Sequence, residues 1–166
     1  MTQFSEVTTR HATQDDIPLI LSFLQKKAEF DRSMGAFEGI LQATEQKLYE
    51  SLFSSVPFAR VLLGDVLGKP IGFALYYFRY SSFAAKPSLW LDDLYVDLAV
   101  RSKGIGSVLM KTLTQIAENT NCTHMAWTAS ANNLRGVSFY GRIGAEIIDR
   151  KGNTLFLKMD VNPDFE

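Results

Sequence analysis

Hydrophobic residues in this chain follow two periods, which divide it into helices and strands. Apolar positions at three- and four-residue spacing predict helices over residues 13–30, 44–53, 105–117 and 132–143. Short apolar runs rich in β-favouring residues predict strands over residues 5–12, 58–65, 71–80, 89–96, 123–128, 145–149 and 154–160. Residues 30–43 and 81–88 follow neither period. We expect a loop or a broken helix over residues 30–43 and a break between strands over residues 81–88.

The order of these elements predicts an α/β (α+β) fold. Turns at Gly68-Lys69-Pro70 and Lys151-Gly152-Asn153 separate neighbouring strands, so each pair is expected to form an antiparallel hairpin. A mixed central sheet of about six to seven strands with helices on both faces follows. The chain shows no internal repeat and no linker, which predicts a single domain over residues 1–166. Long loops in such a domain often line a site, so residues 30–43 are of interest.

The most specific stretch runs from Leu89 to Ala117 and is predicted as strand, glycine turn and helix. Its strand is interrupted only by two acids, as expected of a strand buried on both faces. Arg101 to Gly106 then form Arg-x-x-Gly-x-Gly at the helix start, where uncovered amides and the helix dipole favour a phosphate. An ordinary tight turn could carry the same two glycines. The pattern is neither a dinucleotide fingerprint nor a Walker loop.

Composition narrows the classes of function. The 166 residues carry a net charge of −1, which provides no electrostatic footprint for nucleic acid or an anionic membrane. A single cysteine, Cys122, cannot form an internal disulfide and is expected to be a small core residue. With only His11 and His124 besides, no metal site is expected. The polar N-terminus and the lack of a long apolar run predict a cytoplasmic protein.

The C-terminal third carries a second motif. Asn133, Tyr140 and Gly144-Ala145 follow the glycine turn at the spacing typical of one family. Together with Arg101 to Gly106, this pattern resembles the GNAT superfamily of N-acetyltransferases, and the resemblance covers nearly the whole chain. It implies acetyl-CoA as co-substrate, no metal, and a homodimer.

Within that superfamily the chain resembles the diamine branch, which contains spermidine/spermine and thialysine N-acetyltransferases. The resemblance rests on residues 28–31 (AEFD), 72–78 (GFALYYF), 82–83 (SF) and 91–96 (LDDLYV). Two departures bear on the substrate. Asp31 and Asp92 stand where the branch usually has glutamate, and Ser81-Ser82 lack an acid that some polyamine-acting members carry.

The chemistry of amine acetylation requires an acid near the cleft. A primary amine has a pKa of roughly 10, so it must lose a proton before it attacks the thioester. Asp92 is the candidate base and Asp93 the second choice. Because neighbours in a strand point to opposite faces, we expect only one of them to reach the cleft. Either could instead be a salt-bridged acid.

The remaining roles are what the resemblance implies. Tyr140 would be the general acid that protonates the leaving thiolate. Leu94 and Val96 would bind the pantetheine through their backbone groups, and Asn133 would also contact it. The pyrophosphate would be held by Arg101, Ser102, Lys103, Gly104, Ile105, Gly106 and Ser107. The acceptor amine would lie among Phe30, Asp31, Phe83, Asp92 and Trp127.

Other functions stay open at this point. The acceptor could be an amino acid, an antibiotic amine or a protein amine. A CoA-binding sensor without catalysis is a further alternative, although the presence of both Tyr140 and Asp92 speaks against it.

Overall fold

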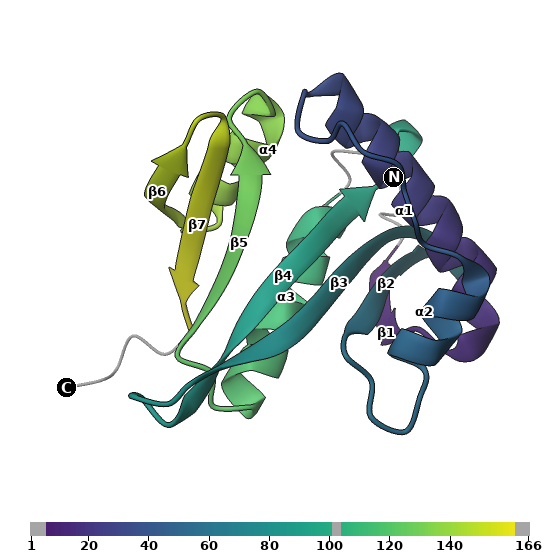
Figure 1. Ribbon diagram of the computed structural model, residues 1–166, viewed down its shortest axis with the longest axis horizontal. Helices are drawn as coiled ribbons and strands as arrows, with labels where there is room; N and C mark the ends of the chain where they lie inside the picture. Colours follow the sequence, from purple (N-terminus) through teal and green to yellow (C-terminus); the bar gives the residue numbers. More distant parts are fainter. Residues whose placement is uncertain (1–5, 101–103, 162–166) are drawn as a thin grey trace.

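A computed structural model describes residues 6–100 and 104–161, and its centre is one seven-stranded sheet in the order β1-β2-β3-β4-β5-β7-β6 (Figure 1). Neighbouring strands are antiparallel except β4 and β5, which run parallel. The strands are β1 (Val7–His11), β2 (Arg60–Val66), β3 (Lys69–Ser81), β4 (Lys86–Val96), β5 (His124–Ser130), β6 (Glu146–Lys151) and β7 (Thr154–Asp160).

Helices cover both faces of this sheet, as the sequence predicts. They are α1 (Ile17–Ser33), α2 (Glu45–Leu52), α3 (Ile105–Asn119) and α4 (Leu134–Arg142), with short 3-10 turns η1 (Gln14–Asp16) and η2 (Leu98–Val100). None of the helices in the described part of the chain has the length and apolar character needed to cross a membrane.

Two hydrophobic cores hold the layers together. Phe23 of α1 stacks on Phe73 of β3 with ring centroids 5.4 Å apart, and Leu48 of α2 completes this core. On the other face, Leu113 of α3 packs in a second core with Trp127 of β5, and both are almost fully buried. Burial of apolar surface on both sides fixes the sheet between α1–α2 and α3–α4.

Most predicted elements are confirmed to within a few residues, and so are both hairpins. Residues 81–88 are the main error, because β3 continues to Ser81 and β4 already begins at Lys86. Ser81 pairs with Lys86, so the two strands form one long hairpin whose turn contains the residues between them. The small and polar residues of this stretch break the apolar pattern, although the residues at both of its ends are paired within the two strands.

Cys122 is buried just before β5, and burial raises the pKa of its thiol. A buried, protonated thiol is a weak nucleophile, which agrees with the expected role as a core residue. His124 is half-buried at the start of β5, as expected of a strand residue.

The parallel ladder between β4 and β5 is short, and it creates an opening in the sheet. Only Leu89–Met125 and Trp90–Ala126 are paired along these two fully described strands. Beyond them the strands diverge, as Figure 1 shows. The prediction that β4 is buried on both faces is therefore wrong for its second half, where Asp92 is exposed and Leu94 and Val96 are only half-buried.

A β-bulge lies at the start of this opening. Leu75 of β3 pairs with Asp93, but Tyr76 pairs with Leu91, so Asp92 is an extra residue in β4. A bulge of this kind interrupts the strict alternation of side chains and re-aims them. It therefore changes where the two neighbouring acids point.

Candidate active site

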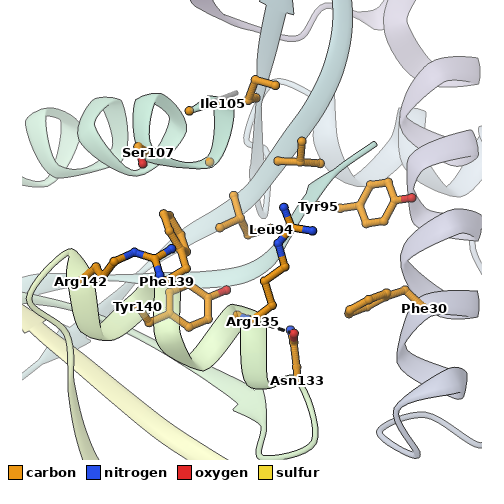
Figure 2. A pocket seen from close by; sticks show the side chains of 14 residues that line it. Phe30, Leu94, Tyr95, Ile105, Ser107, Asn133, Arg135, Phe139, Tyr140 and Arg142 are labelled. Atoms are coloured by element: carbon orange, nitrogen blue, oxygen red, sulfur yellow. Dashed lines mark hydrogen bonds between the residues drawn. The ribbon is translucent and has the colours of Figure 1, made fainter. Parts of the chain in front are cut away.

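One cavity of about 380 Å³ lies where the end of β4 faces the start of α3 and the inner side of α4 (Figure 2). Side chains from α1 close it opposite α4. The residues that line it are Phe30, Leu94, Tyr95, Val96, Gly104, Ile105, Gly106, Ser107, Asn133, Arg135, Gly136, Phe139, Tyr140 and Arg142. The structure thus brings together all of the predicted cofactor-binding residues that it describes. Arg101, Ser102 and Lys103 lie outside the described residues.

The start of α3 supplies an anion-binding geometry. Gly104 precedes the helix with φ of +81°, a left-handed conformation that glycine adopts without the steric penalty of a side chain. Gly106 lies against Phe139 of α4, where an added Cβ would be 3.4 Å from the ring. Gly104, Ile105, Gly106 and Ser107 all line the cavity, so the first turn of α3 borders it, and the helix dipole adds partial positive charge there.

Tyr140 lies between the two aromatic neighbours that hold its ring. The ring centroids of Trp127 and Phe139 are 5.2 and 5.4 Å from it. Burial raises the pKa of Tyr140 to about 12, and the negative charge of Asp31 contributes. The phenol therefore stays protonated at neutral pH and can donate its proton. Figure 2 shows its hydroxyl group directed into the cavity.

Asn133 has a structural task that the sequence analysis missed. It is the N-cap of α4, and its Oδ1 accepts a hydrogen bond from the backbone N–H of Gly136 at 3.0 Å. An asparagine at a helix start is the signal that could have revealed this cap, but the predicted helix already began at residue 132. The side chain still lines the cavity, and the cap fixes the helix that carries Tyr140.

A second cavity of about 300 Å³ occupies the opening between β4 and β5. Phe30, Leu94, Asn133 and Tyr140 line both cavities, so the two meet at Tyr140. The other lining residues are Lys27, Asp31, Met34, Gly35, Ala36, Leu91, Asp92, Asp93, Trp127, Thr128, Ala129, Ser130, Asn153 and Thr154. This second cavity is richer in polar and acidic groups than the first.

Lys27 of α1 binds two of these acids. Its Nζ donates to Asp31, one turn later on the same helix, and lies 3.8 Å from Oδ1 of Asp93 on β4. Burial raises the pKa of Asp93 to about 6, because loss of hydration outweighs the opposing effect of Lys27. The charges of Asp92 and Asp31 raise it further.

Asp92 has a different environment, although it lines the same cavity. It is exposed, and its Oδ1 accepts a hydrogen bond from Nε1 of Trp90 at 3.2 Å. Among the described residues, no lysine or arginine pairs with it. The expectation that only one of Asp92 and Asp93 reaches the cleft is wrong, because the bulge at Asp92 lets both line the cavity.

The predicted substrate residues are only partly brought together. Phe30, Asp31, Asp92 and Trp127 line the second cavity. Phe83 does not lie with them, because it is fully exposed in the turn of the β3–β4 hairpin. Its place in that projecting turn followed from the extra length of the two strands, which the sequence pattern did not indicate.

Three basic residues of the two cavities were not anticipated. Lys27 lines the second cavity, and Arg135 and Arg142 of α4 line the first. A lysine or arginine on a helix surface carries no signal of its own, since its role depends on what the helix packs against. Within residues 6–100 and 104–161, no group of three or more His, Cys, Asp or Glu is placed to hold a metal ion.

Comparison with known proteins identifies the class of this fold and site. Residues 27–145 match the Acetyltransferase (GNAT) family. A thialysine N-epsilon-acetyltransferase from Bos taurus is 27% identical over 84% of each chain. A spermidine/spermine N(1)-acetyltransferase-like protein 1 from Homo sapiens is 33% identical over 89% of this chain and 22% of that longer protein.

Solved structures show the same fold. The PaiA N-acetyltransferase from Thermoplasma acidophilum, in complex with coenzyme A, superposes with a TM-score of 0.74 at 16% identity, covering 93% of this chain and 99% of the other. The chain therefore belongs to the GNAT acetyltransferase family and is an N-acetyltransferase. The family uses acetyl-CoA as its acetyl donor.

The raised pKa of Asp93 predicts a pH-dependent stability. Neutral Asp93 stabilises the fold fully below the ordinary carboxyl pKa of 3.8, and this contribution is lost as the pH rises through about 6. The variant Asp93→Asn has no carboxyl group to ionise at this position, so its stability does not fall in this way. From about pH 4 to about pH 8, its free energy of unfolding should rise relative to the original protein by up to about 3 kcal/mol.

Urea unfolding at a series of pH values measures this difference. The exposed Asp15→Asn serves as the control and should run parallel to the original protein. A constant difference between Asp93→Asn and the original protein across the range would show that Asp93 has an ordinary pKa.

Proposed function

We propose that this enzyme transfers the acetyl group of acetyl-CoA to a primary amine of a small diamine-like or polyamine acceptor. The observation that carries the proposal is the meeting of two chemically different cavities at Tyr140. One faces a helix N-terminus and two arginines, which suits phosphates. The other contains three carboxylates, which suit an ammonium group.

The hydrogen-bond donors and positive charges of the first cavity suit the phosphates of acetyl-CoA. The amides that begin α3 can bind the pyrophosphate, and Arg135 and Arg142 add positive charge at the same cavity. Leu94 and Val96, which are half-buried at the end of β4, line this cavity where the pantetheine arm would pass, on the side where β5 has diverged. Acetyl-CoA bound in this way brings its thioester toward Tyr140.

The second cavity supports the acid–base steps. Asp92 attracts the ammonium form of the acceptor and takes its proton, directly or through water. The free amine then attacks the thioester carbonyl, and the tetrahedral intermediate collapses with expulsion of the CoA thiolate. Tyr140 donates its proton to the sulfur as it leaves, and the proton that the new amide nitrogen must lose restores the phenol through solvent. Positioning and electrostatics supply the catalysis without a covalent enzyme intermediate.

The identity of the acceptor rests on the relatives as well as the cavity. The Bos taurus relative is named for thialysine, and the Homo sapiens relative is named as similar to spermidine/spermine N(1)-acetyltransferase. An L-ornithine N5-acetyltransferase from Arabidopsis thaliana is 24% identical over 83% of this chain. These acceptors share a primary amine and a second charged nitrogen. An amino acid acceptor is the second candidate for the same site. A cytoplasmic location and a homodimer stay predictions.

Thiol release from acetyl-CoA tests the proposed function. The panel of acceptors contains diaminopropane, spermidine, spermine, thialysine, lysine and an N-terminal peptide. We expect turnover well above the rate without acceptor for one or more of the small amines. Turnover with the peptide alone, or with none of the six, would contradict the proposal.

Tyr140→Phe tests the general acid. Without the phenol proton the thiolate leaves unassisted, and we expect kcat to fall about 100-fold or more. Binding of CoA, measured by calorimetry, should change little because the ring remains. Tyr49→Phe is the matched control, since Tyr49 lies on α2 and lines neither cavity. Full turnover in Tyr140→Phe would remove Tyr140 from this role.

Asp92→Asn tests the base through the pH profile. We expect kcat/KM for the acceptor to fall about 100-fold near neutral pH. The deficit should shrink as the pH approaches the amine pKa of about 10, because the acceptor then arrives without its proton. Asp15→Asn again serves as the control. A deficit of the same size at every pH would assign Asp92 to binding alone.

A further inference from the structure

Lys27 is an unexpected member of the acceptor cavity. Among the described residues that line this cavity, the charged side chains are Asp31, Asp92, Asp93 and Lys27. Three ionised carboxylates and one ammonium leave two negative charges. A cavity built only to attract cations would not place a lysine in its wall, since the lysine removes part of the attraction.

The position of Lys27 is held by its contacts. Its side chain is only 19% exposed, and its Nζ is shared between Asp31 and Asp93, which are 27% and 20% exposed. An ammonium group with two carboxylates around it is the arrangement that a charged nitrogen of the acceptor would also seek. Lys27 therefore occupies this acid pair in the structure, and Asp92 has no basic partner among the described residues.

We propose that Lys27 sets the charge of the acceptor and makes the enzyme prefer short diamine-like amines to amines with three or four ammonium groups. This inference rests on the proposed acetylation of a small amine. A dication matches the two negative charges that remain in the cavity. A third ammonium group of the acceptor must either stay outside the cavity or approach Asp31 and Asp93, where Lys27 is already bound and repels it.

Replacement of Lys27 by an uncharged side chain tests this directly. Methionine keeps a long, flexible stem of similar length and removes the charge, so Lys27→Met should free the acid pair. We expect the ratio of kcat/KM for spermidine to that for diaminopropane to rise about ten-fold in this variant, as for the loss of one partly screened like-charge contact. The assay is run at about pH 8, where Asp93 is mostly ionised.

Two further variants separate charge from structure. Lys27→Arg keeps the charge, and its ratio should stay close to that of the original enzyme. Lys26→Met removes the neighbouring lysine, whose Nζ pairs with Asp97 at 3.3 Å and which does not line the cavity. Its ratio should not change. An unchanged ratio in Lys27→Met, or an equal rise in Lys26→Met, would overturn the inference.

A binding measurement keeps this test distinct from that of the proposed function. Calorimetry gives the affinities of the two amines for the enzyme saturated with CoA, which requires no turnover. A shifted affinity ratio in Lys27→Met without turnover would support the role of Lys27 and contradict the proposed reaction. Turnover with an unchanged affinity ratio in Lys27→Met would support the proposed reaction and reject the role of Lys27. If neither amine binds, the role of Lys27 is rejected, and the thiol-release panel decides on the proposed reaction.

Discussion

The parallel pairing of β4 with β5 ends after two residue pairs, and the active site depends on this divergence. A continued ladder would use the backbone groups of β4 from Asp92 to Val96 for pairing with β5, and side chains would fill the space between the strands. Because the strands separate, that edge of β4 faces one cavity toward α3 and another toward α1. The two cores on either face of the sheet keep the opening from closing.

Within this opening, the bulge at Asp92 and the burial of Tyr140 arrange the charges. The bulge lets two successive acids line one cavity, and their different surroundings separate their properties. Asp93 is half-buried beside Lys27 and has a raised pKa, whereas Asp92 is exposed and near solvent, where a proton can leave. Tyr140 remains protonated at the junction of the cavities. Asp92 and Tyr140, the proposed proton acceptor and proton donor, therefore both line the cavity between β4 and β5.

The order of elements and the glycine turn were predictable from the sequence, because period and turn residues are local properties. Features that depend on packing were not. The long β3–β4 hairpin was missed because residues 81–88 break the apolar pattern, and the exposed place of Phe83 was missed with it. Strict alternation along a strand predicted opposite faces for Asp92 and Asp93. That prediction failed because the bulge at Asp92 depends on the pairing of β4 with β3. Lys27 follows another lysine on a helix, and the two differ in the acids that packing brings to them, Asp93 for Lys27 and Asp97 for Lys26.

The most direct test is a crystal structure with a bisubstrate compound in which the sulfur of CoA is joined through an acetyl bridge to diaminopropane. The two-cavity arrangement predicts the pyrophosphate at the start of α3 and the amine portion between β4 and β5. It also predicts the hydroxyl of Tyr140 within hydrogen-bond distance of the sulfur, at about 3 to 3.5 Å. An amine portion outside the β4–β5 opening, or a sulfur remote from Tyr140, would contradict the arrangement.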